Sequence, residues 1–466
     1  MKNNIQKYLT NYAEKEINFS EVITKNYDNV LIIPAYNEYF EIKELLENNL
    51  VDLAKENNFL VILVINSKKE SILNNNLIDF LGDKKIKNSP NTLISFINYD
   101  IFVINRSFEN YYFEEKQGVG LARKIGCDIA TKLYEEGKIK SNWLRCSDGD
   151  VILPKNYFEI NPNPKKYSCI VYDFYHDFIP ENSSGLSLTL YEIYLRYYLF
   201  GLNYANSPYA FYTIGSCMAV EVETYAGVRG FSDSKEAGED FYMMNKLSKI
   251  KNIFDAKEST IRIKYRESDR VPFGTGASIT KIRNKIDASY GILNPARSGD
   301  GGDAPEPHST LGLKSEVFNK NKIYLKKEIE EINDDEYKIY DPKCFEELKK
   351  LYLFLDKNQF LEKLDENEFF IQALIKLGFL ENLEKLKKIS IKKNTSNEIN
   401  YDLVVLKKHI NIWFDAFRIM KFIHYLTDNF YPLISWEEAI KKAPFMEILD
   451  ITSPYELCRK IRLRKN

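Results

Sequence analysis

The sequence of 466 residues predicts an α/β fold, a mainly parallel sheet flanked by helices, followed by an α-helical C-terminal domain. Three observations indicate this. Short apolar runs typical of buried strands alternate with helical segments from residue 29 to about 150, as in βαβ units. Each of these runs is closed by a polar residue. After about residue 311 the pattern becomes almost purely helical and rich in Lys and Glu.

The first third of the chain predicts four strands and the helices that connect them. Strands are expected over 29–36, 59–66, 100–105 and 142–148, and helices over 41–56 and 117–137. The polar residues at the strand ends are Asn37, Asn66, Asn105 and Asp148. Ligands of open parallel sheets bind at the carboxyl ends of the strands. We therefore expect these four side chains to converge.

The middle of the chain continues with mixed elements and then changes character. Strands are expected over 168–175, 211–222 and 259–268, and helices over 185–203 and 237–250. Segment 298–308, SGDGGDAPEPH, has no periodicity and predicts a mobile loop. We place a domain boundary just after it, with the α/β domain over residues 1–310 and the helical domain over 311–466.

Composition limits the partners and the compartment. Lys and Arg number 65 against 67 Asp and Glu, a formal charge of -2, which offers no basic field for nucleic acid. The six cysteines show no CxxC spacing, so neither zinc nor a disulfide framework is expected and a reducing compartment fits. The amino-terminal residues lack the apolar core of a signal, and no apolar run suggests a membrane span. We expect a cytoplasmic protein, with peripheral contact at the inner face of the membrane left open.

The segment WLRCSDGDVILP places the carboxylates of Asp148 and Asp150 one residue apart at the end of a predicted strand. Two like charges this close repel, so a cation or a proton has to compensate them. Mg²⁺ or Mn²⁺ takes one or two carboxylates from a protein and completes its shell with phosphates and water. His308, at the end of the mobile loop, is a candidate to complete such a metal site. A tight turn is the alternative, because Asp-Gly is a strong turn dipeptide.

The segment GVGLARKIG opens the predicted helix over 117–137. Ala122, Gly126 and Ala130 form a stripe of small residues that permits close packing on the sheet. Arg123 beside this stripe can pair with a carboxylate at the end of the next strand or with a diphosphate. The alternative is an ordinary surface arginine. The pattern GxGxxR differs from the dinucleotide fingerprint, so a nicotinamide cofactor is not expected.

Glu239 and Asp240 fall in the first turn of the helix predicted over 237–250. Acidic residues at this position ordinarily complement the helix dipole. The functional interpretation is that Asp240 is a general base that removes a proton from an acceptor hydroxyl, with Glu239 supporting it or contacting the acceptor.

Three further residues are candidates. Arg270, in RESDRVPFGTG, forms a candidate anion site with nearby glycines, although the ending of a Walker loop is missing; a plain loop is the alternative. His176 is considered as a residue that faces an acceptor. His424 shares a helical stripe with aromatic residues and is expected in the core.

Five motifs occur in a fixed order along the first 250 or so residues: PAYNE, GVGLARKIG, SDGD, GSCMAVEVETYAGVRGF and GED. In this order and spacing the chain resembles the family 2 glycosyltransferases, enzymes of GT-A fold. The resemblance implies a Rossmann-like catalytic domain over residues 1–310, a DxD motif, and a nucleotide-diphosphate sugar as the donor. The helical C-terminal part lies outside the resemblance.

The resemblance also implies roles for individual residues. Asp150 would bind Mg²⁺ or Mn²⁺ directly, Asp148 would contact ribose or metal-bound water, and Asp240 would be the base beside Glu239. The residues implied or expected at the nucleotide and its diphosphate are Pro34, Tyr36, Asn37, Glu38, Asn66, Arg123, Asp148 and Arg270.

Departures from the family refine the expected function. In the family an Asp pair commonly ends the second strand, whereas this sequence has Asn66 and Ser67 there. The identity of the nucleotide therefore stays open. The QxxRW motif of processive synthases is missing. We expect transfer of a single sugar, with inversion, to a glycan, lipid-linked or small-molecule hydroxyl; a retaining reaction stays open. The alternatives are a sugar nucleotidyltransferase and a non-catalytic carbohydrate-binding protein on a degenerate transferase fold.

Overall fold

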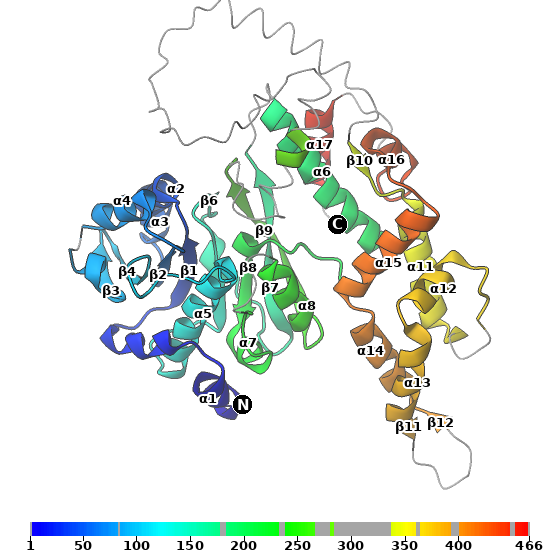
Figure 1. The fold of residues 1–466 in the computed structure, drawn as a ribbon, viewed down its shortest axis with the longest axis horizontal. Coiled ribbons are helices and arrows are strands. Elements are labelled where there is room, and N and C mark those ends of the chain that lie inside the picture. Colours follow the sequence, from blue (N-terminus) through cyan, green and yellow to red (C-terminus); the bar gives the residue numbers. More distant parts are fainter. Residues whose placement is uncertain are drawn as a thin grey trace, which may run out of the picture.

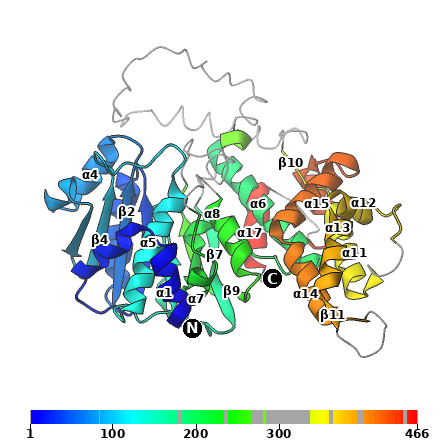
Figure 2. The same ribbon diagram turned by 60° about the horizontal axis from the view of Figure 1, so that its bottom comes forward.

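The computed structural model describes residues 2–82, 84–177, 183–232, 238–265, 280–283, 337–359, 364–392, 400–447 and 453–464. Figure 1 shows a twisted sheet with helices on both faces and, beside it, a region built of helices. Turning the molecule shows the same two regions next to each other (Figure 2).

In the part of the chain that the structure describes, nine strands form one sheet. Their spatial order is β3 (Asn91–Phe96), β4 (Tyr99–Arg106), β2 (Phe59–Asn66), β1 (Asn29–Ala35), β5 (Trp143–Cys146), β8 (Met218–Glu221), β7 (Tyr167–His176), β9 (Asn252–Ile263) and β6 (Val151–Ile152). Strands β4, β2, β1 and β5 are parallel, as are β7 and β9. Strands β3, β8 and β6 pair antiparallel with their neighbours. The predicted α/β class is confirmed as a mixed sheet with a parallel core.

Of the strands described in this sheet, sequence reasoning missed β3 and the two-residue β6. The predicted parallel strands are continuous apolar runs, and β2 is buried at every residue. In contrast, β3 is an edge strand of mixed polarity, NTLISF, in which Ile94 is the residue classed as buried. An edge strand that pairs on one side does not need an apolar pattern along its whole length.

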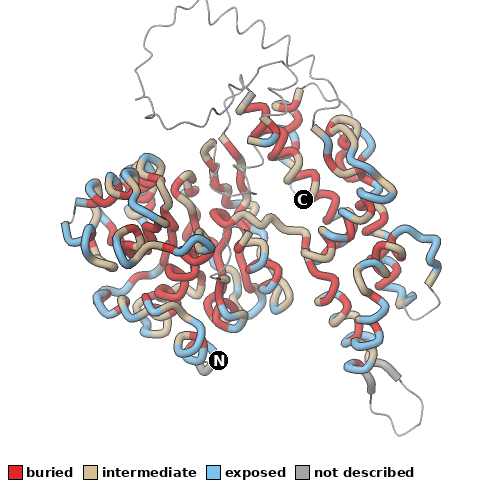
Figure 3. The backbone as a smooth tube through the Cα atoms, viewed as in Figure 1, coloured by how far each residue is buried: buried red, intermediate tan, exposed pale blue. Residues whose placement is uncertain are grey.

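Alternate residues of β1 enter two hydrophobic cores, one on each face of the sheet. Leu31 and Ile33 contribute to one core, and Val30 and Ile32 to the other. The first core is covered by α2 (Tyr39–Glu44), a π-helical turn (Leu45–Asn49), α3 (Leu50–Leu53) and α4 (Ile72–Phe80). The second is covered by α1 (Lys2–Asn11), α5 (Val119–Glu135), α7 (Val222–Gly227) and α8 (Glu239–Leu247). The buried backbone between these layers is visible in Figure 3.

The predicted stripe of small residues on α5 packs against β1. Ala122 and Ala130 are fully buried. A Cβ at Gly126 would lie 2.4 Å from Cγ2 of Ile32, so only a glycine allows the helix to approach the strand this closely. Four 3-10 helices also occur in the described part of this region: Lys15–Val22, Lys84–Asn88, Tyr157–Glu159 and Gly215–Cys217.

The helical region is assembled around α6 (Ser183–Tyr204), which comes from the middle of the chain. Its partners are α11 (Lys343–Asp356), α12 (Phe369–Lys376), α13 (Phe379–Ile389), α14 (Leu403–Trp413), α15 (Ala416–Asn429), α16 (Trp436–Lys442) and α17 (Pro454–Leu463). Side chains of α6 and of these helices form one hydrophobic cluster. Two short antiparallel strand pairs accompany them: β10 (Lys338–Ile339) with β13 (Ile434–Ser435), and β11 (Ile391–Lys392) with β12 (Asn400–Tyr401).

The contact between α6 and α11 is close. A Cβ at Gly201 would lie 2.5 Å from the ring of Phe345. The predicted boundary at residue 310 lies outside the described residues, so the division into two domains stays a prediction. Among the described helices, none combines the length and apolarity needed to cross a bilayer.

Candidate functional site

Arg123 joins the two acidic motifs that the sequence singled out. Its guanidinium donates from Nη2 to Oδ1 of Asp148, at 2.5 Å, and from Nη1 to Oε1 of Glu239. Arg123 is 2% exposed and Glu239 is 4% exposed. Of the two partners predicted for Arg123, the structure contains the carboxylate at the end of the next strand.

A glycine allows Arg123 to occupy this position. Arg123 lies in the second turn of α5, which follows the N-cap residue Gly118. Gly215 lies directly against the guanidinium, where a Cβ would be 2.5 Å from Nη1. The GSCMAV segment therefore contributes to the site because Gly215, its first residue, has no side chain that would displace the guanidinium.

The Asp148-Gly149-Asp150 triplet follows β5 and leads into β6. Asp148 keeps about a third of its side chain exposed, at 31%. A Cβ at Gly149 would lie 2.7 Å from Cδ1 of Ile42 in α2, and the carbonyl of Asp150 accepts from the backbone N–H of Lys264 at 2.7 Å. The tight turn considered as the alternative is present at Gly149 and Asp150, and it lies between α2 and the chain after β9.

Glu239 and Asp240 begin α8, as predicted. Gly238 precedes them with φ of 75°, a left-handed conformation that glycine adopts without steric cost. Oδ1 of Asp240 accepts from the backbone N–H of Phe241 at 2.7 Å. The turn before the helix therefore directs both carboxylates toward Arg123 and the segment at Gly215.

Burial dominates the electrostatics of this acidic pair. Burial raises the pKa of Glu239 to about 7, against the opposing charge of Arg123. Burial likewise raises the pKa of Asp240, although Arg123 and backbone hydrogen bonds from Phe241 and Gly215 oppose it. Desolvation acts to lower the pKa of Arg123, but Asp148 and Glu239 raise it above its ordinary value. The result is a permanent cation beside two acids that hold protons more tightly than usual.

The segment after β1 is held by α4. Pro34 is buried and lies opposite Val64 in the register of β1 and β2. Asn37 has φ of 57°. Its backbone N–H donates to Oδ1 of Asn74 at 3.1 Å, and its Oδ1 accepts from the hydroxyl of Ser71 at 2.5 Å. Sequence reasoning missed Ser71 and Asn74, although Ser71 stands three residues before Asn74 as the N-cap of α4.

The other residues predicted near this segment behave differently. Glu38 is buried and Tyr36 is partly buried beside Asn37. Asn66 donates to the carbonyl of Ala35 at 3.1 Å and its own carbonyl accepts from Asn74 at 2.9 Å, so it lies at the end of β1 as expected. Asn105, in contrast, donates to the carbonyl of Ile86 at 2.8 Å and accepts from Ser107. Its contacts are with the β4 end of the sheet and not with the other three polar residues.

Two of the expected metal ligands, Asp148 and Asp150, lie within the described residues. Within the described residues, no group of three or more His, Cys, Asp or Glu side chains is arranged to hold a metal ion. A divalent cation bound to a diphosphate needs only one or two protein carboxylates, and Asp148 and Asp150 stand together at the end of β5. The donor chemistry of this pair therefore fits Mg²⁺ or Mn²⁺. His308 and Arg270 lie outside the described residues.

His176 lies in a buried ionic cluster and does not face solvent, being 1% exposed. Its Nδ1 is 3.1 Å from Oε2 of Glu192, which also pairs with Arg196 and with Arg462 of α17. Burial acts to raise the pKa of Glu192, but hydrogen bonds from His176 and Arg462 hold it well below its usual range. The cluster fastens α17 to β7 and α6, so the expectation that His176 faces an acceptor is wrong.

His424 also corrects an expectation. It is exposed on α15, and its Nε2 lies 2.9 Å from the hydroxyl of Tyr340. The buried face of α15 carries Ile419, Phe422, Ile423 and Leu426, and the stripe of Phe417, Met420 and His424 lies beside that face.

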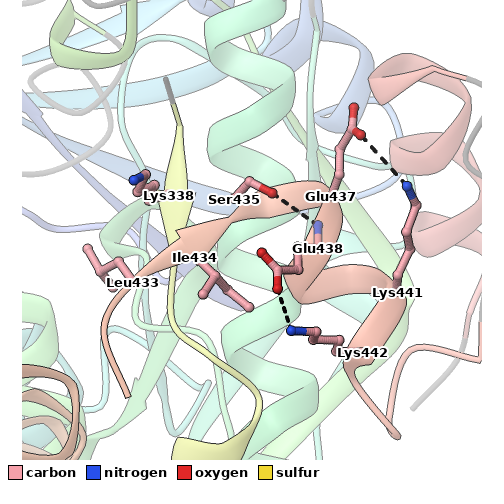
Figure 4. A pocket seen from close by; sticks show the side chains of 8 residues that line it. All are labelled: Lys338, Leu433, Ile434, Ser435, Glu437, Glu438, Lys441 and Lys442. Carbon is pink, nitrogen blue, oxygen red and sulfur yellow. Dashed lines mark hydrogen bonds and ion pairs between the residues drawn. The ribbon is translucent and has the colours of Figure 1, made fainter. Parts of the chain in front are cut away.

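Two cavities lie apart from these residues. One of about 520 Å³ is bordered by β10, β13 and α16 (Figure 4). Its charged side chains pair with one another, as Glu437 does with Lys441 and Glu438 with Lys442. The other, of about 600 Å³, lies at the starts of β1, β2 and β4, where Asp100 already accepts from Lys25, Tyr27 and Ser95. Neither is lined by a residue predicted for the site.

The fold and the site define an α/β protein in which a buried arginine connects a strand-end carboxylate motif with an acidic pair at a helix start. Neither family models nor curated proteins match the chain. Among solved structures, it is similar to GalNAc-T7 with UDP, GalNAc and Mn²⁺, at 13% identity and a TM-score of 0.32, covering 66% of this chain and 57% of that one.

Two other solved structures are similar at the same level. One is S. aureus TarS 1-349, at 13% identity and a TM-score of 0.26, covering 52% and 58%. The other is the mannosyltransferase PcManGT from Pyrobaculum calidifontis in complex with GDP-Man and Mn²⁺, at 12% and 0.31, covering 92% and 94%. The chain thus matches a little over half the length of the first two. Scores this low leave the function to be argued from the site itself.

Proposed function

We propose that this protein is a metal-dependent glycosyltransferase that moves a single sugar from a nucleotide-diphosphate sugar to an acceptor hydroxyl, with inversion. The observation that supports this most directly is the buried pairing of Arg123 with both Asp148 and Glu239. It connects a carboxylate suited to the donor with a carboxylate pair suited to the acceptor. A plain turn and a plain helix cap would not need a shared, buried cation.

On the donor side, the proposed metal ligands are Asp150 and Asp148. A divalent cation bound there neutralises negative charge on the departing diphosphate. Other side chains of this protein shape the nucleotide site and add positive charge to it. Asn37, held by Ser71 and Asn74, shapes the strand end where the nucleotide is proposed to bind, and the charge of Arg123 adds to the positive potential at the leaving group.

On the acceptor side, Asp240 is the proposed base. Its carboxylate accepts the proton of the acceptor hydroxyl while the hydroxyl oxygen forms a bond to the anomeric carbon and the bond from that carbon to the diphosphate oxygen breaks. A base with a raised pKa is better matched to this task near neutral pH than an ordinary aspartate. Glu239 shares the site and, through Arg123, is electrostatically linked to Asp148.

Thermal-shift measurements with UDP, GDP, CDP and dTDP, with and without Mn²⁺, test the donor half of this proposal. We expect one nucleotide to stabilise the protein in a metal-dependent manner. No stabilisation by any of them would contradict the transferase, and would favour a non-catalytic protein. Stabilisation by a nucleoside triphosphate with release of pyrophosphate would favour a nucleotidyltransferase.

Asp240→Asn tests the acceptor half. The substitution keeps the shape of the side chain and removes its basicity, so transfer should be lost while nucleotide binding stays close to that of the wild type. Asp255→Asn on β9 is the control, because this carboxylate is 57% exposed and pairs with Lys257. Loss of nucleotide binding in Asp240→Asn would contradict the assignment of the base.

A further inference from the structure

Asn245 connects α8, the helix that begins with Glu239 and Asp240, to the helical region. Its Nδ2 donates to Oδ2 of Asp415 at 3.1 Å, and its Oδ1 accepts from the backbone N–H of Ala416 at 3.1 Å. Asn245 is 7% exposed. Both the nitrogen and the oxygen of this buried side-chain amide therefore form hydrogen bonds with the junction between α14 and α15.

Asp415 receives several contacts at this junction. It caps α15 by accepting from the backbone N–H of Arg418 at 3.1 Å. Its Oδ2 lies 2.5 Å from Nζ of Lys249, one turn beyond Asn245. Burial acts to raise the pKa of Asp415, but hydrogen bonds from Lys249 and Asn245 lower it below its usual value. The ring of Tyr242 lies 6.4 Å from that of Phe417, so the contact continues toward the start of α8.

Each side of the junction is anchored in its own core. Met243, Met244 and Leu247 of α8 are buried in the cluster that covers the sheet. Phe414, next to Asp415, is 1% exposed in the cluster of the helical region. A hydrogen-bonded link between two packed bodies fixes their relative position more sharply than either core does alone.

We propose that Asn245 and Asp415 are positioning residues: the helical region sets where the first turn of α8 presents Asp240 and Glu239 to Arg123 and the acceptor. This inference rests on the proposed transferase. Asn245 is five residues from Asp240, which is about 7.5 Å along a helix. A small rotation or shift of α8 at Asn245 therefore displaces the carboxylates of Glu239 and Asp240. The residues proposed to bind the nucleotide, at the ends of β1 and β5, remain in place.

Four variants test this: Asn245→Ala, Asp415→Ala, Asp415→Asn and Asp402→Ala. Asp415→Asn keeps a capping side chain and an acceptor for Asn245. Asp402→Ala is the matched control, because Asp402 caps α14 with bonds to Val404 and Val405 that stay within the helical region. The measurements are kcat, the Kd for the nucleotide with Mn²⁺, the melting temperature, and hydrogen exchange of the α8 amides.

We expect Asn245→Ala and Asp415→Ala to lower kcat by about 10- to 100-fold, the cost of a displaced catalytic group, with nucleotide Kd unchanged. Asp415→Asn should recover much of the loss, and the amides of Tyr242 to Leu247 should exchange faster only in the two alanine variants. The control should lose melting temperature without losing kcat. Equal loss of kcat in Asp402→Ala at an equal fall in melting temperature would overturn the inference.

Hydrogen exchange keeps the two proposals separable. A wild-type protein without sugar transfer would contradict the proposed function, yet the exchange of α8 would still show whether Asn245 and Asp415 fix this helix. Unchanged exchange in both alanine variants would overturn the positioning role even in an active transferase.

Discussion

Gly215 and the guanidinium of Arg123 are in direct contact, with space for a hydrogen but not for a methyl group on the α-carbon. Gly215→Ala should therefore push the guanidinium away from Asp148 and Glu239. We expect kcat/KM for sugar transfer to fall by about 100-fold, as for a catalytic group displaced by roughly 1 Å. Steady-state kinetics on the purified variant measure this.

Gly227→Ala is the control for that experiment. Gly227 ends α7, and nothing lies within 4 Å of the position its Cβ would take. This variant should transfer sugar like the wild type. Wild-type kinetics in Gly215→Ala would mean that the position of Arg123 does not matter for the reaction.

The acidic pair predicts a pH dependence of stability with a definite sign. Glu239 titrates near pH 7 in the folded protein and near 4.5 in its ordinary state. Between these values the folded state retains a proton that the unfolded state has released, so the free energy of unfolding falls as pH rises through this window. Urea denaturation of the wild type at both ends of the window measures the slope.

Glu239→Gln should flatten this slope, because glutamine does not titrate. Sugar transfer by the wild type should rise with pH as Asp240, whose pKa burial raises, loses its proton and becomes able to act as the base. An equal slope in the wild type and in Glu239→Gln would assign the pH dependence to other groups.

Asp150 is the residue whose loss should affect metal dependence most. Asp150→Asn should weaken Mn²⁺-dependent nucleotide binding by at least about 10- to 100-fold, the range seen even when a supporting residue around a metal is changed. Calorimetric titration of the nucleotide with and without Mn²⁺ separates this loss from metal-independent binding. Equal metal enhancement in Asp150→Asn and the wild type would remove Asp150 from the metal site.

The contact of Gly126 with Ile32 predicts a purely structural effect. Gly126→Ala should destabilise the protein by about 1–3 kcal/mol, the usual cost of overpacking a core. In Gly126→Ala combined with Ile32→Ala, the new methyl group takes space that the smaller residue vacates, so the combined loss should be less than the sum of the two. Urea denaturation of the four proteins measures this, and strict additivity would contradict the contact.

The parallel core of the sheet was predictable because its strands are buried on both faces and therefore appear as uninterrupted apolar runs. The edge strand β3 lacks that pattern. A helical segment lies where a helix was predicted over 41–56. It is not one continuous α-helix, because a π-helical turn interrupts it at Leu45–Asn49. Local periodicity does not distinguish a π turn from α-helix.

Within the site, sequence reasoning found the local features: carboxylates at a strand end and at a helix start. It did not find that one buried Arg123 serves both, because Glu239 is 116 residues away along the chain. It also considered His176 as a residue that faces an acceptor, whereas His176 lies on β7 and is buried against Glu192 and Arg462, which come from two helices. Long-range pairing of this kind leaves no periodic signal in one sequence.

The place of α6 has a consequence during synthesis. Tyr197 and Phe200 of α6 are buried in one cluster with Phe345 of α11, which a ribosome adds much later. At about 5–20 residues per second this delay is roughly 7 to 30 s. During that interval the aromatic face of α6 emerges without its partner, so the nascent chain exposes an apolar surface after β1 to β7 have been translated and before β8 and β9 have. Folding of this protein in the cell should therefore depend on a holding chaperone more than its final compactness suggests.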